Sequence, residues 1–154
     1  MANNKKHNMP ETRLKHCYGV ARMMYDFAKK HYKWNETKCQ EMYVLGLIHD
    51  AGYEFVSKKT ESQHASILSN VLKNDGYKYF REVKYHDTYT NKYQTEELYL
   101  LWLADMSVDG NGNKVSFEER LEDLENRHGK YSSVVKESKE LIKHIKEHYE
   151  VING

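Results

Sequence analysis

The stretch VLGLIHDAGYEF, residues 44–55, sets an apolar run directly against His49 and Asp50. A helix that becomes apolar all round belongs in the centre of a domain, and Gly52 then breaks it. Imidazole and carboxylate groups are costly to bury without partners. The stretch therefore predicts a core helix that delivers two polar groups to a site, which other segments have to complete.

Outward from this stretch, apolar residues at helical spacing predict further helices. The first runs from Glu11 to about His31, and its apolar stripe comprises Leu14, Val20, Met23, Met24 and Phe27. The central one begins at a cap on Asn35. The others cover 61–74, 77–86, 93–106, 116–129 (from a capping box at Ser116 to a Gly129 cap) and 132–149. With no convincing strand pattern and one proline, Pro10, we expect a flexible N-terminus over 1–10 and one all-α domain, a helical bundle, over 11–154.

Composition limits the class of protein. The 154 residues suit one domain, and 39% hydrophobic with 31% charged residues indicates a soluble chain. A formal net charge of +1 argues against a protein that coats a nucleic-acid polymer. No apolar run approaches the roughly 20 residues that span a membrane. The polar first residues lead into no apolar segment, so we expect no signal peptide. Cys17 and Cys39 form no CxxC motif, so we expect a cytoplasmic location.

Histidine and aspartate residues recur at the ends of the predicted helices, beside apolar stretches. These residues are His16, His49, Asp50, His64, His86 and Asp105. Taken alone, each histidine is usually a hydrogen-bonded core residue, and each aspartate is usually a helix cap or a solvated charge. Together they present nitrogen and oxygen ligands without thiolates, a set that suits Fe, Mn, Co, Ni or Zn. Burying Asp50 and Asp105 is unfavourable without a cation, and one or two divalent ions would offset that cost.

The order His, His-Asp, His, His, Asp resembles the HD-domain superfamily of metal-dependent phosphohydrolases. The resemblance covers roughly residues 11–127 and is carried by RLKHCYGVA (13–21), LGLIHDAGYE (45–54), SQHASIL (62–68), VKYHDTY (83–89) and LWLADMSVD (101–109). It implies an HD-type helical bundle. It also implies that His16, His49, Asp50 and Asp105 bind one metal, and that His64 and His86 hold a second metal with Asp50 bridging.

The resemblance implies hydrolysis of a phosphate ester or anhydride. Asp50 would position the attacking water, and Glu54 is a candidate proton shuttle, with an exposed loop carboxylate as the alternative. Arg13, one turn before His16, is the first candidate for binding the substrate's phosphate. Lys58, Lys59 and Lys84 are further candidates, with solvated surface lysines as the alternative.

The ligand order is most similar to HD enzymes that split dinucleoside polyphosphates. Guanosine-tetraphosphate hydrolases carry a Glu-Asp pair where this chain has Tyr53 and Glu54, so that subgroup is disfavoured. A mononucleotide 5'-nucleotidase and a non-catalytic metal- or nucleotide-binding module stay open. The expected partner is a phosphorylated small molecule, with no nucleic-acid polymer and no membrane, and the sequence leaves room for a homodimer.

Two other patterns suggest metal sites. DGNGNKVSFEE, residues 109–119, is similar to a calcium loop, but its sixth and twelfth places hold Lys114 and Arg120 instead of glycine and glutamate. A turn followed by a helix cap explains the same residues. His144 and His148 are spaced i,i+4, but no third ligand is evident and a solvated face is the better interpretation. We also expect the remaining histidines, His7, His31 and His128, on the surface.

Overall fold

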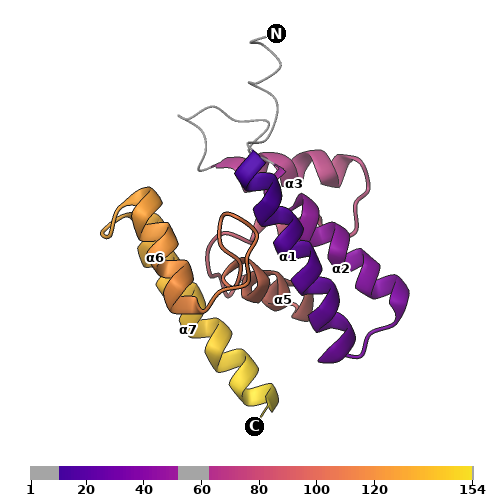
Figure 1. Ribbon diagram of the computed structural model, residues 1–154. Helices are drawn as coiled ribbons and strands as arrows, with labels where there is room; N and C mark the ends of the chain where they lie inside the picture. Colours follow the sequence, from indigo (N-terminus) through magenta and orange to yellow (C-terminus); the bar gives the residue numbers. More distant parts are fainter. Residues whose placement is uncertain (1–10, 52–62, 154) are drawn as a thin grey trace.

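The computed structural model describes residues 11–51 and 63–153, and over these ranges the chain is built from α-helices (Figure 1). The helices are α1 (Glu11–Lys30), α2 (Glu36–Ile48), α3 (His64–Asn74), α4 (Phe80–Lys84), α5 (Glu96–Asp105), α6 (Phe117–His128) and α7 (Ser133–Asn153). Within the described ranges the only β-type pairing is an isolated bridge between Val108 and Lys114. The predicted all-α, single-domain bundle is confirmed.

Helices α1 and α2 lie side by side because small residues face each other across their contact (Figure 1). A Cβ added to Gly46 of α2 would lie only 2.8 Å from the Cα of Ala21 on α1. The predicted cap is present, since the Asn35 side chain accepts a hydrogen bond from the Lys38 amide. Leu14 was wrongly placed on the buried stripe. It lies at the edge of the face that buries Cys17, Val20, Ala21, Met24 and Ala28, and is 41% exposed.

The most central helix is α5, which contributes to two hydrophobic clusters. Leu100, Leu101 and Ala104 pack with α1 and α2 in the first cluster. Leu98, Tyr99 and Trp102 pack with α7 in the second cluster, together with Met106, the residue that follows the helix. The sequence indicated the same role for the end of α2, but Val44 on that helix is 44% exposed. Helix α5 therefore fixes Asp105, its last residue, at the centre of the fold.

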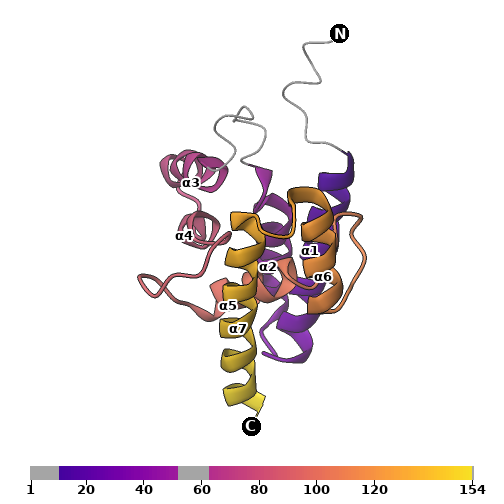
Figure 2. The ribbon, with the colours of Figure 1, turned by 90° about the vertical axis from the view of Figure 1, so that its left-hand side faces the viewer.

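Helices α6 and α7 form a hairpin on the far side of α5 from α1 and α2 (Figures 1 and 2). The capping box that starts α6 is present between Ser116 and Glu119, and Gly129 follows the helix with a φ of 97°. Helix α7 begins at Ser133, one residue after the predicted start, and runs past the predicted end at Tyr149 to Asn153. It packs Leu141, Ile142, Ile145 and Tyr149 into the second cluster. The hairpin is thus anchored on α5 through α7.

Three histidines expected on the surface are half-buried against aromatic rings. His144 stacks on Tyr89 with ring centroids 3.5 Å apart, and His148 stacks on Tyr99 at 3.7 Å. His31 stacks on Phe27. The solvated-face interpretation is therefore wrong for the His144 and His148 pair, whose rings help to fix α7. His128 is exposed, as expected, and His7 lies outside the described residues.

The segment predicted as a helix over 77–86 is helical only from Phe80 to Lys84. The backbone leaves the helix at Tyr85, whose carbonyl accepts a hydrogen bond from the indole nitrogen of Trp102. This contact ties the end of α4 to α5 and fixes the position of His86, the next residue. Cys17 and Cys39 are both buried and not joined by a disulfide. In the described part of the chain, no helix has the length and apolar character needed to span a membrane.

Candidate metal centre

The six predicted ligand residues converge from five segments of the fold. His16 lies on α1, and His49 and Asp50 follow the last residue of α2. The other three are His64 at the start of α3, His86 just after α4 and Asp105 at the end of α5. All six are buried, with at most 8% of their surface exposed. They form two groups that could hold a metal ion, with Asp50 in both.

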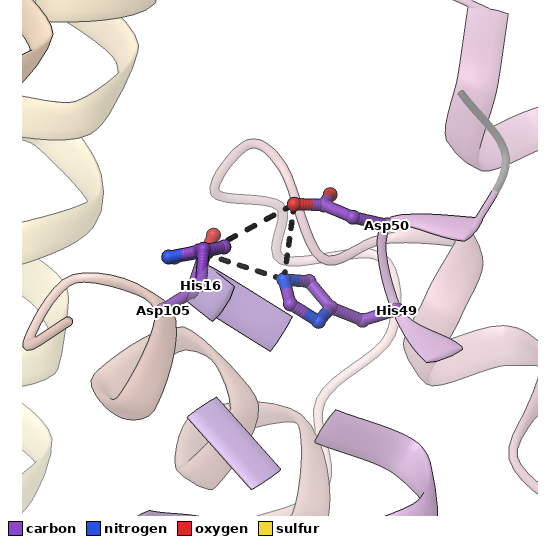
Figure 3. A group of neighbouring side chains, drawn as sticks. All are labelled: His16, His49, Asp50 and Asp105. Carbon is purple, nitrogen blue, oxygen red and sulfur yellow. Dashed lines mark hydrogen bonds and ion pairs between the residues drawn. The ribbon is translucent and has the colours of Figure 1, made fainter. Parts of the chain in front are cut away.

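The first group consists of His16, His49, Asp50 and Asp105 (Figure 3). The Nε2 atom of His16 lies 2.7 Å from Oδ1 of Asp105 and 3.8 Å from Oδ2 of Asp50. The Nε2 atom of His49 lies 3.4 Å from each of the same two oxygens. Two imidazole nitrogens and two carboxylate oxygens thus surround one small volume.

The second group consists of Asp50, His64 and His86. The other carboxylate oxygen of Asp50, Oδ1, lies 3.2 Å from Nε2 of His86 and 3.7 Å from Nε2 of His64. Asp50 therefore turns Oδ2 to the first group and Oδ1 to the second. This is the placement that a bridging carboxylate requires, as the resemblance implies.

Backbone carbonyls orient three of the imidazole rings. The Nδ1 atoms of His16, His49 and His86 donate hydrogen bonds to the carbonyls of Asp109, Gly46 and Val83, respectively. A carbonyl only accepts, so Nδ1 must carry the proton. In a neutral ring, Nε2 then carries the lone pair and faces the carboxylates. This backbone support is typical of histidines that bind metals.

The donor set fits a cation. A neutral imidazole that donates through Nδ1 points its Nε2 lone pair at an anionic oxygen, which is repulsive unless a proton or a metal ion lies between them. The Nε2 atom of His49 is buried and makes no hydrogen bond. A divalent ion would accept both the nitrogen and the oxygen lone pairs, and nitrogen with oxygen ligands suits transition metals.

The same contacts shift the pKa values of the cluster. Burial alone would lower the pKa of His86, but its hydrogen bond to Asp50 and the charge of Asp87 raise it to about 9. Burial opposes ionisation of Asp50 and Asp105 as well, but the neighbouring histidines outweigh it and hold both carboxyl pKa values below their ordinary range. The metal-free cluster therefore favours anionic carboxylates together with protons on His49 and His86, whose pKa values are both raised by the carboxylates. A metal ion has to displace those protons.

Arg120 is a functional candidate that the sequence reasoning did not single out. Its Nε donates to the backbone carbonyl of Asp105 at 3.0 Å, and its Nη2 lies 3.7 Å from Oδ1 of the same residue. The side chain is buried, and Nη1 donates to Asp123. One signal was available, because an arginine on the same face of an amphipathic helix as Leu124 requires a buried acidic partner.

A cavity of about 580 Å³ opens from the metal groups towards α6 and α7. Arg13 lines it, with Nη1 at 3.8 Å from Oδ2 of Asp50, so this predicted substrate-binding residue is brought to the site. Asp87, not singled out from the sequence, also lines it. Lys84 is not among the lining residues, since it is exposed on α4 with its ammonium over the Tyr85 ring. The other candidates, Glu54, Lys58 and Lys59, lie outside the described residues.

In the loop that resembles a calcium site, carboxylate oxygens accept hydrogen bonds from backbone amides of the loop itself. Oδ1 of Asp109 accepts hydrogen bonds from the amides of Asn111 and Asn113, both at 2.9 Å. The Glu119 carboxylate accepts from the Ser116 amide in the capping box. This is the turn and helix cap that the sequence offered as the alternative. In the described part of the chain, the two groups able to hold a metal do not include this loop.

No protein-family model matches the chain, and no curated protein or solved structure matches it either.

Proposed function

We propose that this protein is an HD-type metal-dependent phosphohydrolase that cleaves a phosphate ester or anhydride of a nucleotide. The observation that carries the proposal is the position of Asp50, whose two oxygens face two separate histidine groups. All six residues of the resemblance take part, and none is replaced by a residue that cannot bind a metal. A degenerate, non-catalytic binding module would be expected to have lost some of them.

The residues of the site have distinct roles in this proposed function. His16, His49, Asp50 and Asp105 would hold one divalent transition-metal ion, and Asp50, His64 and His86 a second. When bound, such ions supply a Lewis acid and lower the pKa of water. Asp50 orients the water through the carboxylate that both groups share. Arg13 is close enough to Asp50 to bind a phosphoryl oxygen at the same place.

The cavity supports a nucleotide as the substrate class. Its volume of about 580 Å³ lies in the range of small-molecule sites, roughly 300–1,000 Å³. Arg13, Arg120 and Arg127 line it and offer donors for phosphate oxygens. We propose a dinucleoside polyphosphate as the first candidate and a mononucleotide as the alternative. Two buried free thiols suit a cytoplasmic location.

A substrate screen with defined metals tests the proposal. The metal-free protein is loaded separately with Mn, Fe, Co, Ni or Zn and mixed with mono-, di-, cyclic and dinucleotides, and the phosphate and nucleotide products are measured. We expect hydrolysis of one class with at least one metal and its loss in Asp50→Ala. Arg22→Ala replaces an exposed arginine that lines a different cavity. It is the matched control and should retain activity. Unchanged turnover in Asp50→Ala would contradict the proposed mechanism.

A further inference from the structure

An alternating row of charges runs outward from the metal groups along the wall of the cavity. Arg120 contacts Asp105 through Nη2 at 3.7 Å and donates through Nη1 to Oδ2 of Asp123 at 2.9 Å. The other oxygen of Asp123, Oδ1, lies 3.3 Å from Nε of Arg127. Arg120 and Arg127 both line the cavity, so they present two cationic groups at different depths.

Gly110 makes room for the outer arginine. A Cβ at this position would lie 1.6 Å from Nη2 and 2.2 Å from Cζ of Arg127, so the guanidinium rests against the bare Cα. Gly110 is not one of the glycines with positive φ. Its small size, rather than its backbone conformation, is therefore what the local structure requires. The Gly110 amide also donates to Oδ2 of Asp123 at 3.2 Å.

These contacts fix a side chain that would otherwise be flexible. Arg127 is 43% exposed at its side chain, yet it is held between Asp123 and Gly110. The Nε contact uses one of the five N–H donors of the guanidinium. Arg120 contacts both Asp105 and Asp123, whereas Arg127, at the outer end of the row, contacts Asp123 alone among these acidic groups and keeps its other donors for a ligand. A fixed guanidinium binds a phosphate through paired hydrogen bonds at a low cost in side-chain entropy.

We propose that Arg127, positioned by Asp123 and Gly110, binds an anionic group of the substrate other than the one at the metal groups. This inference rests on the proposed function and narrows its substrate class. Arg127 is separated from Asp105 by two intervening charged side chains, Arg120 and Asp123, so it serves a group further along the cavity than one beside the metal ligands. The ligand that fits is a phosphate chain with at least one anhydride bond, whose second phosphate binds Arg127.

Direct binding of inorganic pyrophosphate and orthophosphate tests this inference through affinity, independently of nucleotide hydrolysis. Both anions are titrated by calorimetry into metal-loaded protein freed of excess metal. The variants are Arg127→Ala, which removes the guanidinium, and Gly110→Ala, which displaces it while retaining its charge. Arg22→Ala, which replaces an exposed arginine at a different cavity, is the control. The ion content of every sample is measured.

We expect the wild type to bind pyrophosphate more tightly than orthophosphate. Arg127→Ala and Gly110→Ala should each weaken pyrophosphate binding by about tenfold or more, the loss expected for hydrogen bonds to a charged group. Orthophosphate affinity and ion content should stay unchanged in both variants, and all values should stay unchanged in Arg22→Ala. Equal affinity of the wild type for the two anions would overturn the inference. So would unchanged pyrophosphate affinity in either variant.

The outcome is separable from that of the proposed function. If the wild type hydrolyses nothing in the substrate screen but pyrophosphate binding still depends on Arg127 and Gly110, the anion site stands and the phosphohydrolase proposal fails. If a nucleotide is hydrolysed while both variants keep full pyrophosphate affinity, the phosphohydrolase proposal stands and the role of Arg127 is disproved.

Discussion

The Nε2 atom of His16 lies 2.7 Å from Oδ1 of Asp105, while the Nδ1 atom of the same ring donates to the Asp109 carbonyl. The ring therefore meets the carboxylate favourably only with a second proton or with a cation between the two groups. The metal-free and metal-loaded proteins should therefore differ in what lies between these two groups.

The first prediction concerns metal stoichiometry. Because Asp50 turns a different oxygen to each group, the two sites should be separable by mutation. His86→Ala should lose one of two bound ions, since His86 belongs only to the second group. Asp50→Ala should weaken both sites. Elemental analysis after equilibrium dialysis measures the ions per chain, and an equal content in wild type and His86→Ala would contradict the two-group arrangement.

The second prediction concerns the pH dependence of stability. The pKa of His86 is about 9 in the folded, metal-free protein against an ordinary value of about 6.5. A raised pKa stabilises the fold fully below pH 6.5, and this contribution is lost as the pH rises through 9. The urea midpoint of metal-free protein should therefore fall over this range, and more steeply in wild type than in His86→Gln.

Metal loading should reverse that trend. Protons and metal ions compete for the same imidazole nitrogens, so metal affinity should rise with pH over the same range. Thermal unfolding of the loaded protein at several pH values measures the effect. Identical pH profiles for metal-free and metal-loaded samples would show that the ions bind elsewhere.

The third prediction concerns the support of Asp105 by Arg120. Arg120→Ala removes the buried donor to the Asp105 carbonyl and one of the two cations that contact Asp123. We expect a loss of about 3 kcal/mol in the free energy of unfolding, as for other broken buried ion pairs, and weaker binding at the first metal group. Urea unfolding and metal titration measure the two effects, and exposed Arg22→Ala should leave both unchanged. Full metal affinity in Arg120→Ala would rule out a positioning role.

The sequence was sufficient to predict the fold class and the six candidate ligands, because helical spacing and ligand chemistry are both local patterns. It did not predict the features that depend on how the helices pack against one another. Leu14 and Val44 are as apolar as their buried neighbours, and only the packing of α1 and α2 leaves them exposed. In the sequence alone, Arg120 and Arg127 resemble ordinary surface arginines. Only the α6–α7 hairpin shows that they lie in the cavity wall.

The fourth prediction concerns the contact between α1 and α2, which holds His16 next to His49. A Cβ at Gly46 would meet the Ala21 backbone at 2.8 Å, so Gly46→Ala has to separate the two helices. We expect a destabilisation of about 2 kcal/mol, typical of overpacking, together with weaker metal binding at the first group. Val44→Ala, on the exposed face of the same helix, is the control and should change neither. A Gly46→Ala protein with unaltered urea midpoint and metal affinity would contradict this packing argument.

The most direct test of the central claim is a crystal structure of Mn-loaded protein with anomalous difference maps at the Mn absorption edge. We predict two peaks per chain, one beside each carboxylate oxygen of Asp50, with His16, His49 and Asp105 around the first and His64 and His86 around the second. Maps without a peak at these residues, or with the metal bound only elsewhere on the chain, would contradict the account.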